Sequence, residues 1–446
     1  MKPKYSISLS LLFGCTRTSG LLLIAITLGI AGFSRELLAS TRDSLSIKNV
    51  NVVDVMKGKI VRSQTVVIEG SVISFVGRST PHEFPENSKT IDGSGKYLAP
   101  GLWDMHFHLC WAGDNDRLLY PILLRNGITG VRDMGGDAGV MRRFKAALAS
   151  GEIEGPEIFG AGPMLDGDPP VYRDFSVALR SDTNIPTLLN GLRSNGVDFF
   201  KTYSLIREQQ LKEIAEYCVK HDMTFAGHLS EYIEPETSIS LGQRSVEHLN
   251  RLEEIWAADK SRIDRIGNAM ASKGAFLCPT LITYKLKAAV RDHSIINDEY
   301  AKYIPQSLTK EWKEVWAKRI ARHEKNGDWN SLDGKFESQK QLVRFLHKKG
   351  VILLAGSDFA GMPYVYPGIG LHQELELMAA AGLSNADVLR TATINPALYF
   401  SEAKIRGSVT VGKYADLLLL KKDPLRDIRA LRELSVVISK GKVLEQ

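Results

Sequence analysis

The sequence GLWDMHFHL, at residues 101–109, places two histidines one residue apart in a short apolar segment. In a β-strand, successive side chains point to opposite faces, so His106 and His108 would project from the same face. Two imidazoles in this arrangement can chelate one divalent metal ion, but a His-x-His pattern also occurs by chance. The pair alone leaves a metal site and an ordinary strand open, and further ligands must come from elsewhere in the chain.

The composition is that of an ordinary globular protein. The chain has 446 residues, of which 44% are hydrophobic and 24% charged, enough for one large domain or two smaller ones. The formal net charge is +6, but no stripe of lysine and arginine with interleaved aromatic residues occurs, so no nucleic-acid partner is expected. The four cysteines lack the close spacing of a disulfide framework or of a cysteine-type zinc site.

The first forty residues differ from the rest of the chain. A basic start, MKPKY, precedes the apolar run LLLIAITLGIAGF at 21–33 and the small residues Ala39 and Ser40. The apolar run is short for a membrane-spanning helix but suits a secretory signal. We therefore expect residues 1–40 to direct export to the periplasm or the cell exterior, with cleavage near Ala39 or Ser40. The alternative is an uncleaved N-terminal anchor, and only then would the protein contact a membrane.

Short β-rich segments occur at both ends of the remaining chain. Near the beginning they are IKNVNVVDV, QTVVIEGSVISFVG and KTIDGSGKYLAPG, and near the end GSVTVGKYADLLLLKK and LSVVISKGKVLE. Glycine and asparagine punctuate these segments, as is typical of hairpins. We expect residues 45–100 and 403–446 to form one small β-sandwich domain built from both termini.

Strand-like and helical segments alternate through residues 101–402. With the His-x-His strand there are eight candidate strands, the others being 130–134, 156–162, 198–203, 224–230, 245–249, 275–281 and 351–359. This alternation predicts an α/β fold with a (β/α)8 barrel of the TIM type. The charged, mostly helical region 282–345 is longer than a simple connection, so we expect a helical insert between strands seven and eight.

Polar residues stand at the ends of these strands, where a barrel of this type carries its chemistry. They are His106, His108, Lys201, His228, His248 and Asp358. Each has an ordinary alternative: a histidine in the core or on the surface, a snorkelling lysine, or an aspartate that caps a helix. All six at one end of a single barrel favour a metal site.

Several segments resemble the amidohydrolase superfamily, in particular its imidazolonepropionase-like and prolidase-like branch. The resemblance covers roughly residues 45–446 and rests on APGLWDMHFH, GITGVRDMGG, GPEIFGAGP, VDFFKTY, SVEHL, LLAGSDFAG, LHQELELMAAAGLSNADVLRTATINPA and GSVTVGKYADLLLLKKDPL. The segment AGHLSE around His228 departs from the usual pattern of the family.

This resemblance implies a site for two divalent metal ions, expected to be zinc. The implied ligands are His106, His108 and Asp358 for the more buried ion, His228 and His248 for the more exposed ion, and a CO2-derived carboxylate on Lys201 as the bridge. A mononuclear site with an unmodified Lys201 is the alternative. The resemblance also implies that Asp358 acts as general base and then general acid, with a hydroxide that bridges the metals as the attacking group.

Two further residues are candidate substrate contacts. Tyr203 lies two residues after Lys201, should share its strand face, and lies where relatives contact the substrate, although barrel packing is an equal alternative. Arg132, followed by Asp133, is a candidate for binding a substrate carboxylate. A structural ion pair at the barrel rim is the favoured interpretation of that pair.

The function implied is an exported, metal-dependent hydrolase of C–N bonds, preferably a dipeptidase or an N-acyl-amino-acid amidase. Hydrolysis of a cyclic amide, a lactone or a phosphoester is the alternative, since such a site tolerates several electrophiles. A catalytically silent envelope binding protein on the same fold is the non-enzymatic alternative, against which the complete ligand set argues. The expected partner is a small-molecule substrate, and a homo-oligomer is compatible with the sequence.

Overall fold

The computed structural model describes residues 44–446 apart from 79–88, 113–115, 293–297, 330 and 445–446. The predicted export segment, residues 1–40, lies outside the described residues. Among the helices that the structure describes, none combines the length and the apolar character that crossing a membrane requires.

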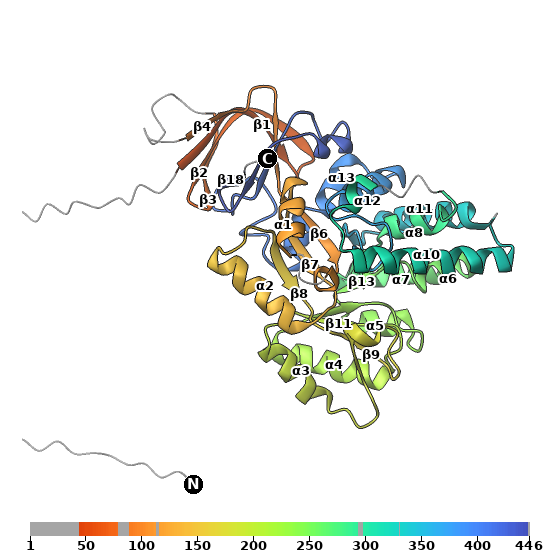
Figure 1. The fold of residues 1–446 in the computed structure, drawn as a ribbon. Coiled ribbons are helices and arrows are strands. Elements are labelled where there is room, and N and C mark those ends of the chain that lie inside the picture. Colours follow the sequence, from red (N-terminus) through yellow and green to blue (C-terminus); the bar gives the residue numbers. More distant parts are fainter. Residues whose placement is uncertain (1–43, 79–88, 113–115, 293–297, 330, 445–446) are drawn as a thin grey trace, which may run out of the picture. The chain divides into compact units, whose positions relative to one another are not determined.

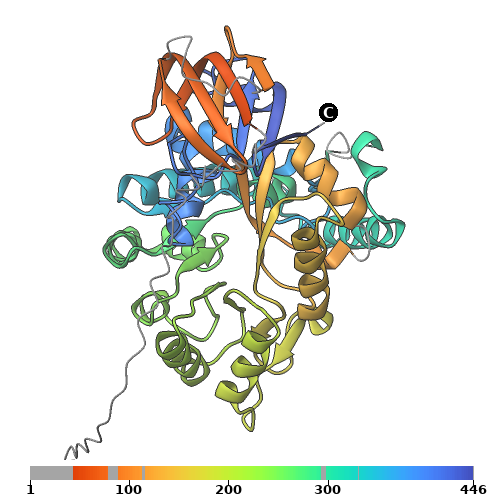
Figure 2. The same ribbon diagram turned by 90° about the vertical axis from the view of Figure 1, so that its left-hand side faces the viewer.

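Strands from both ends of the described chain form one sheet of eight strands (Figures 1 and 2). They are β1 (Ser44–Asp54), β2 (Lys59–Glu69), β3 (Val72–Gly77), β4 (Lys89–Asp92), β5 (Tyr97–Pro100), β16 (Leu417–Leu420), β17 (Leu434–Ser439) and β18 (Lys442–Leu444). The strand order is β18-β17-β16-β5-β1-β2-β3, and β4 pairs with β1. The antiparallel pair β16–β5 joins the two ends of the chain. That this sheet folds into a two-layer sandwich stays a prediction.

Four consecutive leucines in β16 connect this terminal sheet to the rest of the molecule. Because side chains alternate along a strand, Leu417 and Leu419 lie in the apolar core of the terminal sheet. Leu418 and Leu420 lie in the larger core that contains the barrel residues. All four are fully buried, so β16 is packed on both faces.

The central part of the chain is an α/β fold of short parallel strands. The strands are β6 (Leu102–Phe107), β7 (Ile128–Asp133), β8 (Glu157–Gly160), β9 (Met164–Asp166), β10 (Ser176–Ala178), β11 (Phe200–Thr202), β12 (Phe225–Gly227), β13 (Ser245–Glu247), β14 (Phe276–Cys278) and β15 (Ile352–Leu353). They pair as β6-β7-β8 and as β10-β9-β11-β12-β13-β14-β15, always in parallel.

Backbone hydrogen bonds connect these two sheets on both sides. On one side, Met105 N donates to Ala355 O and Asp358 N donates to His106 O. On the other side, Asp198 N donates to Gly160 O. The parallel strands and these bonds are consistent with the predicted TIM-type barrel.

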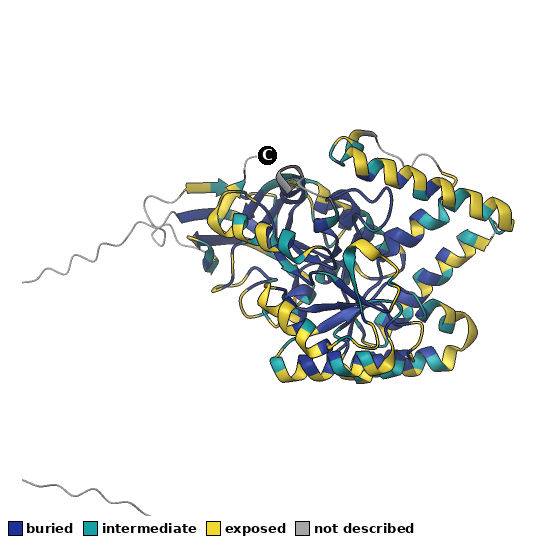
Figure 3. Cartoon of the chain, turned by 60° about the horizontal axis from the view of Figure 1, so that its bottom comes forward, coloured by how far each residue is buried: buried dark blue, intermediate teal, exposed yellow. Residues whose placement is uncertain are grey.

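Helices connect the strands and cover the outside of the barrel. They are α1 (Asp116–Arg125), α2 (Ala138–Ser150), α3 (Ile185–Ser194), α4 (Glu208–His221), α5 (Pro235–Ser240), α6 (Leu252–Ala258), α7 (Lys260–Lys273), α12 (Ile369–Ala380), α13 (Asn385–Thr391) and α14 (Ile394–Tyr399). Figure 3 shows buried strands surrounded by helices with one exposed face. The ends of α2 are typical: the Asp137 side chain accepts from Val140 N, and Gly151 adopts the left-handed conformation after the last turn.

The described residues between β14 and β15 form four α-helices on one side of the barrel (Figure 1). They are α8 (Leu281–Ala288), α9 (Asp298–Ala301), α10 (Gln306–Asn326) and α11 (Ser331–Lys348). Helix α10 buries Trp312, whose ring meets that of Phe359 edge to face at a centroid distance of 6.4 Å. Because Phe359 follows Asp358 in the chain, this contact places α10 beside the end of the barrel that carries the candidate ligands. The predicted domain boundaries stay predictions.

Candidate active site

The structure brings the six candidate metal ligands together in one small cavity. His106 lies within β6 and Lys201 within β11. The other four follow strands: His108 follows β6, His228 follows β12, His248 follows β13 and Asp358 follows β15. All six line the same cavity of about 150 Å³. The carboxyl ends of parallel barrel strands all face the same way. Side chains near those ends therefore meet in one place, although they are far apart in the sequence.

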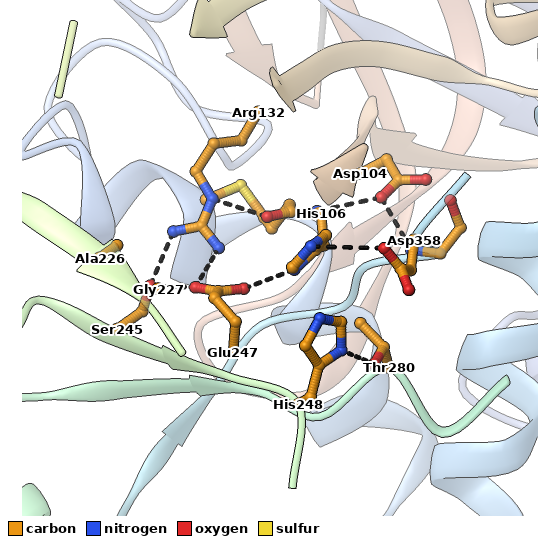
Figure 4. Close-up of polar contacts among 12 residues, drawn as sticks. Asp104, His106, Arg132, Ala226, Gly227, Ser245, Glu247, His248, Thr280 and Asp358 are labelled. Atoms are coloured by element: carbon orange, nitrogen blue, oxygen red, sulfur yellow. Dashed lines mark hydrogen bonds and ion pairs between the residues drawn. The ribbon is translucent and has the colours of Figure 1, made fainter. Parts of the chain in front are cut away.

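Asp358 lies between the two histidines of the opening motif. Its Oδ1 atom is 3.5 Å from Nε2 of His106 and 3.5 Å from Nε2 of His108 (Figure 4 shows the first of these). The three residues offer ligand atoms that all lie within 4.8 Å of one another. His106 Nε2 is buried and has no hydrogen-bond partner among the described residues. Two imidazoles and a carboxylate that converge in this way are a donor set suited to a divalent metal ion.

Each of the four histidines uses its Nδ1 atom to contact the protein. The partners are Glu247 Oε2 for His106 (2.7 Å), the Gly135 carbonyl for His108 (3.1 Å), Ser204 Oγ for His228 (3.0 Å) and Thr280 Oγ1 for His248 (2.6 Å). The Nε2 atom is therefore the nitrogen that each ring has left for a metal ion. Such contacts fix the orientation and the tautomer of a ligating histidine.

Burial favours the neutral, metal-binding form of three of these histidines. The pKa values of His106, His228 and His248 lie well below the usual value, chiefly because burial disfavours the imidazolium. Burial by itself would raise the pKa of Asp358, but His248 and His108 beside the carboxylate hold that pKa below its usual value. The site thus combines neutral imidazoles with an ionised carboxylate.

Lys201 lines the same cavity. Its side chain is fully buried, and Nζ has no hydrogen-bond partner among the described residues. Burial lowers the pKa of this lysine to about 8, although Glu247 and Asp358 act in the opposite direction. An unpartnered ammonium group is costly in such a place, so the environment fits a lysine that is modified or held by bound ions.

The backbone is strained where it presents the ligands. His248, Thr280 and Asp358 have φ angles of 64°, 48° and 60°, in the left-handed region that residues other than glycine rarely adopt. Such conformations cost about 1–3 kcal/mol each and cluster at functional sites. All three residues contribute to this site, two as candidate ligands and Thr280 as the partner of His248.

Arg132 lies inside the barrel rather than in the cavity. Its Nε donates to the Met105 carbonyl (2.6 Å), its Nη1 to Ser245 Oγ (2.8 Å) and its Nη2 to Glu247 Oε1 (2.7 Å) (Figure 4). The side chain is fully buried. Every nitrogen of the guanidinium thus bonds to the protein, and a substrate contact of Arg132 stays a prediction. The ion pair forms with Glu247 in the interior, not at the rim.

Two carboxylates that support the ligands were missed by the sequence analysis. Glu247 joins Arg132 to the ring of His106, and it immediately precedes His248 in the chain. Asp104 accepts from the backbone N–H groups of Ser357 (2.9 Å) and His106 (3.2 Å), so it holds β6 and the Asp358 segment together. Burial raises the pKa of Asp104 to about 7.

The sequence signal for both carboxylates was their spacing. Asp104 lies two residues before His106, and Glu247 lies two residues after Ser245, so each points to the same face of its strand as a residue that it supports.

Aromatic and basic side chains complete the wall of the cavity. Trp111, Tyr172 and Tyr203 line one part, and Lys287 and Arg319 from the helices after β14 line another. The ring of Tyr203 lies 4.0 Å from that of His228 between centroids. Its pKa is raised well above the usual value by burial, so the hydroxyl stays protonated. That Tyr203 contacts the substrate stays a prediction.

The model of the amidohydrolase family matches residues 97–444 of the chain. This protein belongs to the amidohydrolase family. The family resemblance predicted from the strand-end motifs is thereby confirmed. Members of this family are hydrolases that act on C–N bonds, and they are generally metal-dependent. The convergent donor set of this amidohydrolase fits that chemistry.

Comparisons with individual proteins agree with the family. Ochratoxinase from Aspergillus niger is 23% identical over 440 residues, covering 84% of this chain and 81% of the relative. The structure of a putative prolidase from Bifidobacterium longum matches with a TM-score of 0.72 at 24% identity, over 91% of this chain and 95% of the other. A Xaa-Pro dipeptidase with methionine bound in its active site matches with a TM-score of 0.70 at 19% identity, over 91% and 100%. These structural matches establish that the amidohydrolase shares their fold.

Proposed function

We propose that this amidohydrolase is a metal-dependent dipeptidase or N-acyl-amino-acid amidase. The observation that carries the proposal is the convergence of the six candidate ligands on one buried cavity. A prolidase and a Xaa-Pro dipeptidase among the proteins of the same fold support an amide or peptide bond as the target.

The proposed metal centre uses the ligands expected from the sequence. They are His106, His108 and Asp358 for one zinc ion, His228 and His248 for a second, and a carboxylated Lys201 between them. The buried and unpartnered Nζ of Lys201 supports a bridging role, because a carboxylate there would replace an isolated cation by a metal ligand. A single ion with an unmodified Lys201 is the alternative. When bound, the metal ions supply a water of lowered pKa and polarise the carbonyl group of the substrate.

The side chains of the cavity have separate roles in the proposed reaction. Asp358 accepts a proton from the attacking water and delivers it to the amine as the C–N bond breaks. Glu247, through the ring of His106, keeps Nε2 of that histidine directed at the centre. Tyr203, which lines the cavity beside His228, offers its protonated hydroxyl to the substrate.

Metal analysis combined with a substrate panel tests this function. We expect about two zinc ions per chain and hydrolysis of dipeptides or N-acyl amino acids by the metal-loaded protein. A ratio near one zinc ion per chain, unchanged when bicarbonate is added, would favour the mononuclear site. Turnover of lactones or phosphoesters without turnover of amides would contradict the proposed reaction. A metal-loaded protein that turns over no member of the panel would favour a binding protein.

We also propose that residues 1–40 direct export. The basic start and the short apolar run at 21–33 support this. N-terminal sequencing of protein from its native host tests the proposal. A start between residues 32 and 45 is expected, an intact Met1 in a membrane fraction would indicate an anchor, and Met1 in the cytosol would contradict export.

A further inference from the structure

A second cavity adjoins the candidate active site. It has a volume of about 520 Å³, and it shares Asn250, Lys287 and Arg319 with the cavity of the metal ligands. Its other lining residues come mainly from α10 and α11. The active-site cavity, at about 150 Å³, is much the smaller of the two. The shared residues make the larger cavity the adjoining space into which a substrate at the candidate ligands can extend.

The second cavity is strongly basic. Its cationic side chains are Lys287, Lys318, Arg319, Arg322 and Lys335. Glu253 is the single carboxylate among the described residues that line it. The Glu253 carboxylate pairs with Lys335 Nζ at 3.1 Å and also accepts from Gln339.

Four cations remain without a counterion. For Lys287, Lys318, Arg319 and Arg322, no ion pair with a carboxylate occurs within the part of the chain that the structure describes. Three of them lie on α10 at spacings of one, three and four residues, where like charges on one helix face repel one another. An anion bound among these side chains would offset the repulsion between them.

Lys287 and Arg319 stand where the two cavities meet. Burial lowers the pKa of Lys287 to about 8, and Arg319 lowers it further. Burial also lowers the pKa of Arg319, with a smaller contribution of the same sign from Arg322. In both cases burial disfavours the charged form, although Asp358 and Glu253 act in the opposite direction on Lys287, and a carboxylate bound beside the two groups would oppose the effect of burial.

We propose that the basic cavity binds the part of the substrate that carries two carboxylates, so that the preferred substrates are amides of glutamate or aspartate. The α-carboxylate, next to the scissile amide, would lie at Lys287 and Arg319. The side-chain carboxylate, a few bonds further away, would reach Lys318 and Arg322. This proposal rests on the amide hydrolysis proposed above and names its substrate class.

Substrates of nearly the same shape test directly whether the side-chain carboxylate of the substrate is recognised. Paired dipeptides and N-acetyl amino acids that end in glutamate or glutamine differ in charge but hardly in shape. We expect kcat/KM to be at least about tenfold higher for the glutamate substrates than for the glutamine substrates, because one charge-assisted hydrogen bond contributes an effect of this size. Arg322→Gln should reduce this preference to about threefold or less. Lys313→Gln, an exposed lysine of α10 that does not line the cavity, should leave the preference unchanged.

A binding measurement separates this proposal from the proposed function. Calorimetry with the full-length purified protein compares L-glutamate with L-glutamine, the amino-acid halves of the two substrates. If amides are hydrolysed with equal kcat/KM for glutamate and glutamine, the proposal is overturned. If no amide is hydrolysed, the proposed function fails. In that case tighter binding of glutamate, weakened by Arg322→Gln, would still support the anion site, and equal binding would overturn it.

Discussion

The active-site cavity and the basic cavity are lined by different kinds of secondary structure. The candidate ligands project from the ends of buried parallel strands, and strained backbone and buried carboxylates hold them in place. The cations of the basic cavity project from helices between β14 and β15, and Lys318 and Arg322 are exposed. We therefore expect the strand-end residues to determine the reaction and the helices between β14 and β15 to determine which substrates bind. Changes in the two regions should therefore act on different quantities.

The largest effect is expected from Asp358→Asn. The substitution preserves the volume of the side chain but removes the proton acceptor and an anionic ligand, so kcat should fall by about 10²–10⁴-fold. Metal content is measured beside the rate: retained metal with a lost rate isolates the proton transfer, whereas joint loss assigns only a ligand role. A kcat close to that of the unmodified protein would contradict the mechanism.

Lys201→Ala should produce the next largest effect. Removing the proposed bridge between the ions should lower kcat by roughly 10²-fold, because part of the charge stabilisation by the centre is lost. Short-chain carboxylic acids added to the assay should restore part of the activity by occupying the place of the bridge. Full activity of the variant without such additives would rule out the bridging role.

Glu247→Gln tests whether the buried carboxylate supports the ligands from behind. The change should weaken metal affinity by about 10–100-fold, because the contact at Nδ1 of His106 loses its charge. It should also lower the free energy of unfolding by about 3–5 kcal/mol, because Arg132 loses its buried partner. A chelator titration and denaturant unfolding measure the two quantities.

Glu254→Gln provides the matched control for that experiment. Glu254 is an exposed carboxylate on α6, outside both cavities, and neither quantity should change in this variant. If Glu247→Gln left metal affinity intact while stability fell, Glu247 would serve the fold alone.

The smallest effect concerns the junction between the barrel and the added helices. Glu374 on α12 accepts from Ile282 N at 2.7 Å, at the start of the helix that carries Lys287. Burial raises the pKa of Glu374 to about 8, so the folded protein binds a proton that the unfolded chain releases above about pH 4.5. The contribution of Glu374 to the free energy of unfolding should therefore decrease as the pH rises from about 5 to 8.

Glu374→Gln should remove this part of the pH dependence, since the amide resembles the protonated acid. The variant should match the unmodified protein near pH 5 and exceed it by about 1–3 kcal/mol near pH 8.5, as measured by denaturant unfolding. Parallel pH profiles for the two proteins would show that Glu374 is ionised in the folded state.

The strand-end residues were accessible to sequence reasoning, whereas Arg132 was not. His106 and His108 follow from the two-residue period of a strand, and Lys201 and Asp358 follow from the rule that parallel barrel strands end on one face. The hydrogen-bond partners of Arg132, a residue of β7, depend on which interior side chains of β13 lie across the barrel from it. Glu247, its partner, is 115 residues away in the chain.

The basic residues of α10 were equally hidden. In the sequence, Lys318, Arg319 and Arg322 are ordinary members of a charged amphipathic helix. Only the docking of α10 beside the barrel, through contacts such as Trp312 with Phe359, brings Arg319 to the wall of the active-site cavity.

The order of residues along the chain was enough to predict an α/β fold, a family and a set of candidate metal ligands that the fold brings together. Periodicity and side-chain chemistry are properties of short segments, so they can be recognised without knowing how distant segments meet. The support of His106 by Glu247, across 141 residues of chain, could come only from the folded molecule. The same holds for the basic cavity, because like charges from separate helices line one cavity only after those helices have packed together.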